Sequence, residues 1–157
     1  MKKIYIYMAF IIISSLILTG CGGPEEELLD EPDIDYGTSA VFTQSDIDEC
    51  ISMVREQMDS WNIDYNIQRI SYGGDDLSVD GLQYAYSLTS GEIYPDCMVL
   101  LVDFISLSDS KAYKKNKLYD DWEWIFLKSS EGEWMLFSNG HILDYVAGCQ
   151  IIPEIMI

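Results

Sequence analysis

Apolar residues recur at intervals of three and four positions just before the centre of the chain. Such spacing places them on one stripe of a helix, which consists of Ile47, Cys50, Ile51, Val54, Met58 and Trp61. Thr43 and Asp46 precede this run and are three residues apart, which is the pattern of a capping box. The sequence therefore predicts an amphipathic helix that begins near Thr43 and ends near Asn62.

After this helix the pattern changes to short runs rich in β-branched and aromatic residues. Residues 65–72 and the continuously apolar residues 97–105 are predicted strands, and the second has the composition of a central strand. Residues 121–128 and 134–141 flank the segment SSEGE, whose glycine is typical of a hairpin turn. One amphipathic helix followed by antiparallel strands is an α+β pattern.

These elements predict a single α+β domain, residues 42–157, in which one N-terminal helix packs on a curved, cone-like antiparallel sheet of about four strands. Residues 73–95 are predicted to be a long irregular connection. The connection 106–120 carries four of the seven basic residues that remain when residues 1–20 are removed. The apolar tail, residues 142–157, is expected to pack on the domain because water would not favour its exposure.

The N-terminus predicts where the protein is located. Lys2 and Lys3 precede an uncharged apolar run, residues 4–18, which is typical of a secretory signal and shorter than the roughly 20 residues that span a bilayer. The run ends in Leu-Thr-Gly-Cys, which resembles the bacterial lipobox. The resemblance implies a signal peptide of residues 1–20 and lipidation of Cys21 by acyl chains such as palmitate, on the extracytoplasmic face of the cell membrane. An uncleaved anchor helix and an ordinary secreted protein are the alternatives to lipidation, and the outer-membrane leaflet is the alternative location of the lipidated protein.

The charge of the mature chain is strongly negative. Removing the signal peptide leaves 7 basic and 27 acidic residues, a formal net charge of about −20. Such a charge repels phosphate backbones, so nucleic acid is not expected as a partner. It also repels anionic lipid headgroups, so the body of the domain is expected to stand away from the membrane. Residues 21–41 hold seven acids and two prolines between Pro24 and Gly37, which predicts an extended, lipidated acidic tether. An acidic docking strip is the alternative for this segment.

Three cysteines, Cys50, Cys97 and Cys149, remain for the domain, so at most one intramolecular disulfide forms. Cys50 lies on the apolar helix stripe, where a buried thiol is common, so Cys97 and Cys149 are the preferred pair. The chain has no C-x-x-C motif, and its one histidine, His141, follows no cysteine at ligand spacing. No metal site built on cysteine and no cofactor is therefore expected.

Catalytic signals are weak. No Ser/His/Asp order and no Cys/His signature surrounds His141, which favours a strand-end residue over an acid–base group; a nucleophilic Cys97 acting with His141 is the alternative. The segment Asp76–Gly81 begins like a calcium-binding loop, but position 12 is Ser87 where such a loop has glutamate. A polar turn explains the same residues, so the sequence leaves calcium binding open.

Three tryptophans, Trp122, Trp124 and Trp134, belong to the predicted hairpin. Trp122 and Trp124 are two residues apart and therefore point to the same face of their strand. We expect Trp124 and Trp134 to be core residues and Trp122, which follows two aspartates, to lie at the rim. A stacking platform for sugars is the alternative.

The order of the segments VFTQSDIDECISMVREQM, RISY, CMVLLVDF, DWEWIFLKSSEGEW and GH resembles a family of uncharacterised lipoproteins of Gram-positive bacteria. The resemblance covers about residues 42–141 and implies a small cone-shaped α+β fold related to the nuclear transport factor 2-like and cystatin-like superfold. The family closes the last strand with Gly-Tyr, whereas this chain has Gly140-His141. The resemblance implies no established activity.

Together these features favour a non-enzymatic, membrane-anchored extracytoplasmic lipoprotein that binds a small ligand or an extracellular protein. A small hydrolase or isomerase that uses the cavity of the cone is one alternative. An immunity- or inhibitor-like envelope protein is the other.

Overall fold

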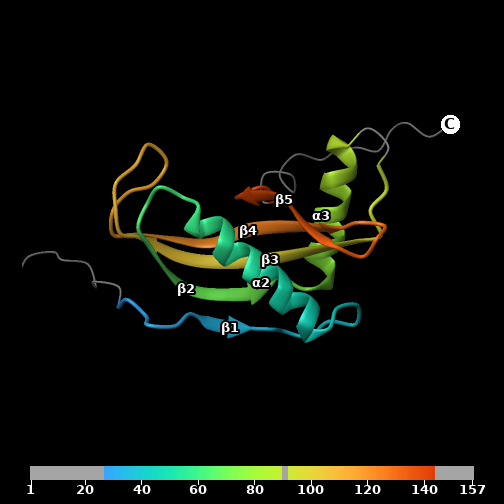
Figure 1. The fold of residues 1–157 in the computed structure, drawn as a ribbon, viewed down its shortest axis with the longest axis horizontal. Coiled ribbons are helices and arrows are strands. Elements are labelled where there is room, and N and C mark those ends of the chain that lie inside the picture. Colours follow the sequence, from blue (N-terminus) through green and yellow to red (C-terminus); the bar gives the residue numbers. More distant parts are fainter. Residues whose placement is uncertain (1–26, 90–91, 144–157) are drawn as a thin grey trace, which may run out of the picture.

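A five-stranded mixed sheet with one helix on each face makes up the part of the chain that the computed structural model describes, residues 27–89 and 92–143 (Figure 1). The elements in chain order are β1 (Asp33–Asp35), α2 (Gln44–Asp59), β2 (Tyr65–Tyr72), α3 (Asp75–Leu88), β3 (Asp96–Ser106), β4 (Lys117–Lys128) and β5 (Trp134–Gly140). The α+β class is confirmed, but the sheet is open and has five strands, and two helices replace the single one that was expected.

The strands lie in sequence order, β1-β2-β3-β4-β5, and every neighbouring pair is antiparallel except β1 and β2. β3 is central and buried on both faces, because its side chains alternate between two hydrophobic clusters. Met98 and Leu100 belong to the cluster that α2 covers, and Cys97 and Val99 belong to the cluster that α3 covers. A strand that is covered on both faces explains the continuously apolar run.

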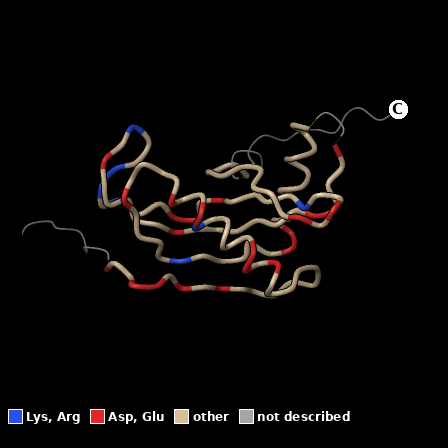
Figure 2. The backbone as a smooth tube through the Cα atoms, in the orientation of Figure 1, with Lys and Arg blue, Asp and Glu red and all other residues tan. Residues whose placement is uncertain are grey.

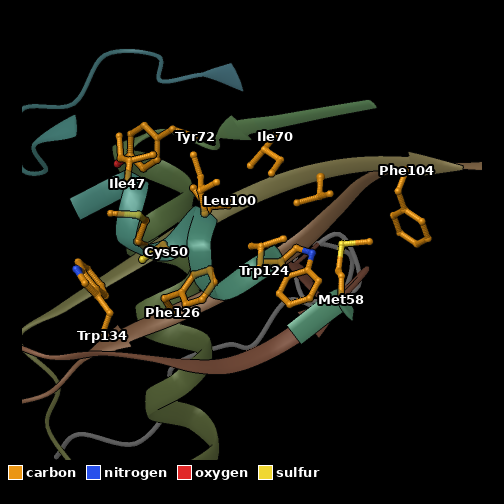
Figure 3. Packing of buried hydrophobic residues seen from close by; sticks show 14 of the residues in the cluster. Ile47, Cys50, Met58, Ile70, Tyr72, Leu100, Phe104, Trp124, Phe126 and Trp134 are labelled. Carbon is orange, nitrogen blue, oxygen red and sulfur yellow. The ribbon is translucent and has the colours of Figure 1, made fainter. Parts of the chain in front are cut away.

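Helix α2 begins as its sequence predicts. The Thr43 side chain accepts a hydrogen bond from the Asp46 backbone N–H, and the Asp46 carboxylate accepts one from the Thr43 backbone N–H. The buried face of α2 packs on large side chains of the sheet (Figure 3). The buried residues of α2 are Ile47, Cys50, Ile51, Val54 and Met58. The predicted hairpin is also present, and the Ser129 backbone N–H closes its turn onto the Glu133 carbonyl at 2.8 Å.

Helix α3 lies within residues 73–95, so the prediction of an irregular connection there is wrong. Its buried face consists of small residues, Ser78, Gly81 and Ala85, and therefore lacks the large apolar stripe that sequence periodicity detects. Small residues are required because the helix lies very close to β3. A Cβ atom at Gly81 would come within 2.8 Å of Val99 Cγ2 and 2.9 Å of Cys97 Sγ.

Strand β1 corrects the predicted extent of the tether. The sequence predicts a tether up to residue 41, but Asp33–Asp35 pairs with β2, and Ile34 and Tyr36 pack against the α2 cluster. Further towards the N-terminus, Leu29 N donates to Asn66 Oδ1 at 3.1 Å and Leu29 O accepts from Asn66 Nδ2 at 2.8 Å. The folded domain therefore starts before residue 42, and the acids of β1 flank its single apolar residue.

Several predicted features lie outside the described residues, namely the signal peptide, Cys21, Cys149 and the tail from residue 144. Of the tail, Leu143 is buried against the α3 cluster, and the backbone N–H groups of Ile142 and Leu143 donate to Glu123 Oε2. Within residues 27–89 and 92–143, no helix combines the length and the hydropathy that crossing a membrane requires.

Candidate functional site

An apolar hollow beside α3, called the α3 groove below, is the first candidate site. It has a volume of about 240 Å³. Its apolar walls are Val41, Phe42, Val79, Leu82 and Pro95, and its polar groups are Asp75, Ser78, Asp96 and the buried Cys97. The segment before α2 thus meets helix α3 and the start of β3 at one hollow, although α2 and β2 separate that segment from α3 in the sequence.

The Asp75 carboxylate links the segment before α2 to the first turn of α3. It accepts hydrogen bonds from Ser39 Oγ at 2.6 Å, Tyr72 Oη at 2.6 Å and the Ala40 backbone N–H at 3.0 Å. The Ser39 and Tyr72 hydroxyls, followed by the Ala40 N–H, lower the pKa of Asp75. Three donors of the same chain thus keep the carboxylate ionised, and its role is structural because it joins the segment before α2 to α3.

Ser78 is buried below the groove and also serves the fold. Its Oγ accepts a hydrogen bond from the Val99 backbone N–H at 3.3 Å and lies 3.4 Å from Tyr72 Oη. Burial, followed by the hydrogen bond to Asp75, raises the pKa of Tyr72. No hydrogen bond that the structure gives for the described residues joins Ser78 to a histidine, so Ser78 lacks the adjacent base that activates a serine nucleophile.

Neither described cysteine has the environment of a nucleophile. Burial raises the pKa of Cys97 to about 12 and raises the pKa of Cys50 even further, so both thiols stay protonated at neutral pH. Cys97 pairs with Leu127 at one end of β4, whereas His141 lies at the end of β5 with its ring 5.0 Å from that of Trp122. The structure does not bring Cys97 and His141 together, and the Cys97–Cys149 disulfide stays a prediction.

Both interpretations of Asp76–Gly81, a calcium-binding loop and a polar turn, are wrong. These residues belong to α3, where Ser78 and Gly81 face the sheet and cannot surround an ion. Among the described residues, no group of three or more histidine, cysteine, aspartate or glutamate side chains is arranged to hold a metal.

The outer edge of the α3 groove combines exposed apolar side chains with uncompensated acids. Val41 is 60% exposed and Val79 is 54% exposed, and both line the same hollow, so the edge of the groove presents apolar side chains to solvent. Asp76 and Asp80 are exposed beside Val79 on the same helix. The ion pairs within the described parts of the chain involve Asp46, Asp103 and Asp121, and not these two acids.

A second candidate surface lies at the opposite end of the sheet. The loop 107–116 joins β3 to β4 and, with the first residue of β4, carries Lys111, Lys114, Lys115 and Lys117. We call residues 107–117 the lysine loop. Figure 2 shows basic residues gathered on it, whereas most other charges on the backbone are acidic. The Tyr113 ring stacks on Trp61, with ring centroids 5.3 Å apart.

The tryptophans of the hairpin are located as expected. Trp124 is fully buried and stacks on Trp61 at 5.8 Å, and Trp134 is 6% exposed. Trp122 is half-buried and donates from Nε1 to Asn139 Oδ1 at 3.3 Å. The core prediction for Trp124 and Trp134 is confirmed, so the three rings do not form an exposed stacking platform.

The α3 groove itself has no signal in the sequence, because it depends on contacts such as Ser39–Asp75 between residues far apart in the chain. The lysine cluster is visible in the sequence, but its position beside Trp61 is not. Comparisons of the chain with protein-family models, curated proteins and solved structures give no match. The resemblance to a Gram-positive lipoprotein family therefore stays a prediction.

Proposed function

We propose that this protein is a lipoprotein anchored through Cys21 on the extracytoplasmic face of the cell membrane, and that its domain binds a partner protein in the α3 groove without catalysing a reaction. The observation that carries the binding function is an apolar hollow with exposed Val41 and Val79 at its edge and uncompensated Asp76 and Asp80 beside it. The partner chemistry that fits is a segment with apolar side chains flanked by lysine or arginine.

The size of the groove favours a protein partner over a small molecule. Small-molecule pockets usually enclose about 300–1,000 Å³, whereas the α3 groove holds about 240 Å³. Such a volume accommodates one or two inserted side chains of a partner, and exposed apolar residues around it supply further contact area. An immunity- or inhibitor-like role would be one form of this binding.

The polar groups of the groove favour binding over hydrolysis or isomerisation. Asp75 is held by three donors of its own chain, and Ser78 is bonded to the backbone of β3. Cys97 has a pKa of about 12 because it is buried. An acid–base or nucleophilic group needs a pKa near the working pH or an adjacent base, and these three residues have neither.

The anchor is tested by feeding cells labelled palmitate. The wild-type chain should carry the label, and Cys21→Ala should lose it, because only the thiol at that position forms the thioether. Equal label in both proteins would refute lipidation at Cys21, whatever the domain binds.

The binding function is tested with a photoreactive amino acid placed at Val79 in the full-length protein in its native cells. The matched control carries the same group at Glu56, which is exposed on α2 on the other side of the sheet. We expect a discrete adduct with a second protein from position 79 and none from position 56. Asp76→Lys combined with Asp80→Lys should weaken that adduct, because it reverses the charge at the edge of the groove.

Three results would contradict this function. Equal adducts from positions 79 and 56 would mean non-specific proximity, and an adduct that withstands the charge reversal would refute the charge complementarity. Cross-links only to residues 144–157 of the same chain would mean that the protein covers its own groove.

A further inference from the structure

The basic residues of this acidic protein are concentrated at one end of the fold. Of the seven basic residues in the mature chain, four lie on the lysine loop, and all four are exposed. Arg69 and Lys128, in contrast, form ion pairs with carboxylates. Within residues 27–89 and 92–143 no lysine of the loop forms an ion pair. Asp109 lies on the same loop, where its carboxylate accepts a hydrogen bond from the Lys115 backbone N–H at 3.2 Å. With four lysines and one aspartate the loop keeps a net positive charge, which no ion pair among the described residues neutralises.

Hydrogen bonds and stacking hold the lysine loop in a defined conformation. Ser110 N donates to Tyr113 O at 2.8 Å, Lys114 N donates to Tyr119 Oη at 2.8 Å, and Asn116 N donates to Ser106 O at 2.7 Å. The stacking of Tyr113 on Trp61 fixes the middle of the loop against the segment that directly follows α2. A surface that is already ordered loses little conformational entropy when it binds.

The chain enters the domain at the same end of the sheet. Leu29 is bonded to Asn66 on β2, and Asn66 pairs with Ile105, next to the last residue of β3 before the lysine loop. Figure 1 shows the N-terminal part of the described chain and this loop at the same end of the sheet, away from α3. Seven residues lie between Cys21 and Leu29, so the two Cα atoms are at most about 28 Å apart when the chain is fully extended.

From this geometry we propose that the lysine loop contacts the anionic phospholipid headgroups of the membrane that holds the Cys21 anchor. This inference rests on the proposed anchor. Each lysine near an anionic surface contributes about fivefold to binding, while the acidic remainder of the domain is repelled. The half-buried Tyr113 and Trp61 beside the lysines are side-chain types that favour the membrane interface.

The first experiment measures how fast an amine reagent modifies each lysine of the lipidated protein in vesicles. Vesicles of phosphatidylcholine alone are compared with vesicles that also contain phosphatidylglycerol. Modification of Lys111, Lys114 and Lys115 should slow about fivefold in the anionic vesicles and recover at 1 M salt, because salt screens the attraction. Lys128, which is paired with Asp46 at the opposite end of the sheet, is the internal control and should not change.

A second experiment removes the anchor. The mature chain with Cys21→Ser should bind anionic vesicles weakly, and Lys115→Gln should reduce that binding about fivefold. Arg55→Gln is the matched control, because it also removes one exposed positive charge but lies on α2, and it should have a much smaller effect.

Equal modification rates in both vesicle types, or equal effects of Lys115→Gln and Arg55→Gln, would overturn the membrane contact. A third outcome would also overturn it: the loop lysines are modified slowly in both vesicle types, and the double variant Glu25→Gln, Glu26→Gln makes their modification fast. The chain's own acids would then occupy the loop. Absence of palmitate at Cys21 would instead overturn the proposed anchor, and the vesicle binding of the Cys21→Ser chain would still test the loop.

Discussion

Replacing Trp124 with alanine tests whether the tryptophan hairpin holds the domain together. Trp124 lies on β4 between Leu100 of β3 and Asn139 of β5, is fully buried and stacks on Trp61 with an interplanar angle of 18°. Truncating it would leave a cavity where the central strands meet α2, because the backbone of a sheet paired on both sides cannot close the gap.

The expected cost is large relative to the stability of a single domain. Large-to-small changes of buried tryptophan typically cost about 3–5 kcal/mol, and a domain has about 5–15 kcal/mol in total. At about 4 °C per kcal/mol for a domain of this size, Trp124→Ala should lower the Tm by about 12–20 °C.

Thermal and urea denaturation of the chain from residue 22 onwards, followed by circular dichroism, provide the measurement. Trp122→Ala is the matched control, because the same ring is removed from the same strand at a half-buried position. It should cost under about 2 kcal/mol, mainly through packing and the hydrogen bond to Asn139. If both variants melt like the wild type, Trp124 is not a core residue and the hairpin becomes a candidate binding surface.

Three further predictions follow from individual contacts. Gly81→Ala should destabilise the protein by about 1–3 kcal/mol in urea, although alanine favours helices, because its Cβ would lie within 2.9 Å of both Val99 and Cys97. The hydrogen bonds of Thr43, aided by Lys128, lower the pKa of Asp46 from 3.8 to about 2, so the ionised carboxylate stabilises the fold above pH 4. Asp46→Asn should therefore lower the free energy of unfolding by about 1 kcal/mol at pH 7, and this difference from the wild type should vanish as the pH falls towards 2. After reduction, Cys97 should resist iodoacetamide at pH 8 in the folded protein and react in urea, because burial raises its pKa to about 12; rapid labelling in the folded state would contradict this.

Local patterns were sufficient for the elements whose buried faces are made of large side chains. Helix α2 has an apolar stripe and a capping box, and both appear in the structure because no distant contact opposes them. The hairpin of β4 and β5 was equally predictable, since its strands are adjacent in the sequence and Gly132, with φ of 91°, supplies the turn conformation.

Elements defined by distant contacts were not predictable. Helix α3 packs through Ser78, Gly81 and Ala85, whose small size reflects a close approach to β3 and leaves a weak apolar period. Strand β1 has one apolar residue, Ile34, within an acidic segment, and it becomes a strand only because β2 offers a free edge. The α3 groove depends on α3, so it could not be predicted either.

The two proposed surfaces should act independently, because β3 separates them. The α3 groove lies at Asp96 and Cys97, where β3 begins, and the lysine loop follows its last residue, Ser106. The 11 residues of β3 span roughly 35 Å at about 3.3 Å per residue, and sites so far apart with no shared partner rarely couple. Changing Lys111, Lys114 and Lys115 to glutamine should therefore leave the photo-adduct at Val79 unchanged while the loop lysines no longer contribute to vesicle binding. If the adduct disappears together with the vesicle contact, partner binding depends on how the domain is oriented on the membrane, and the two surfaces are one functional unit.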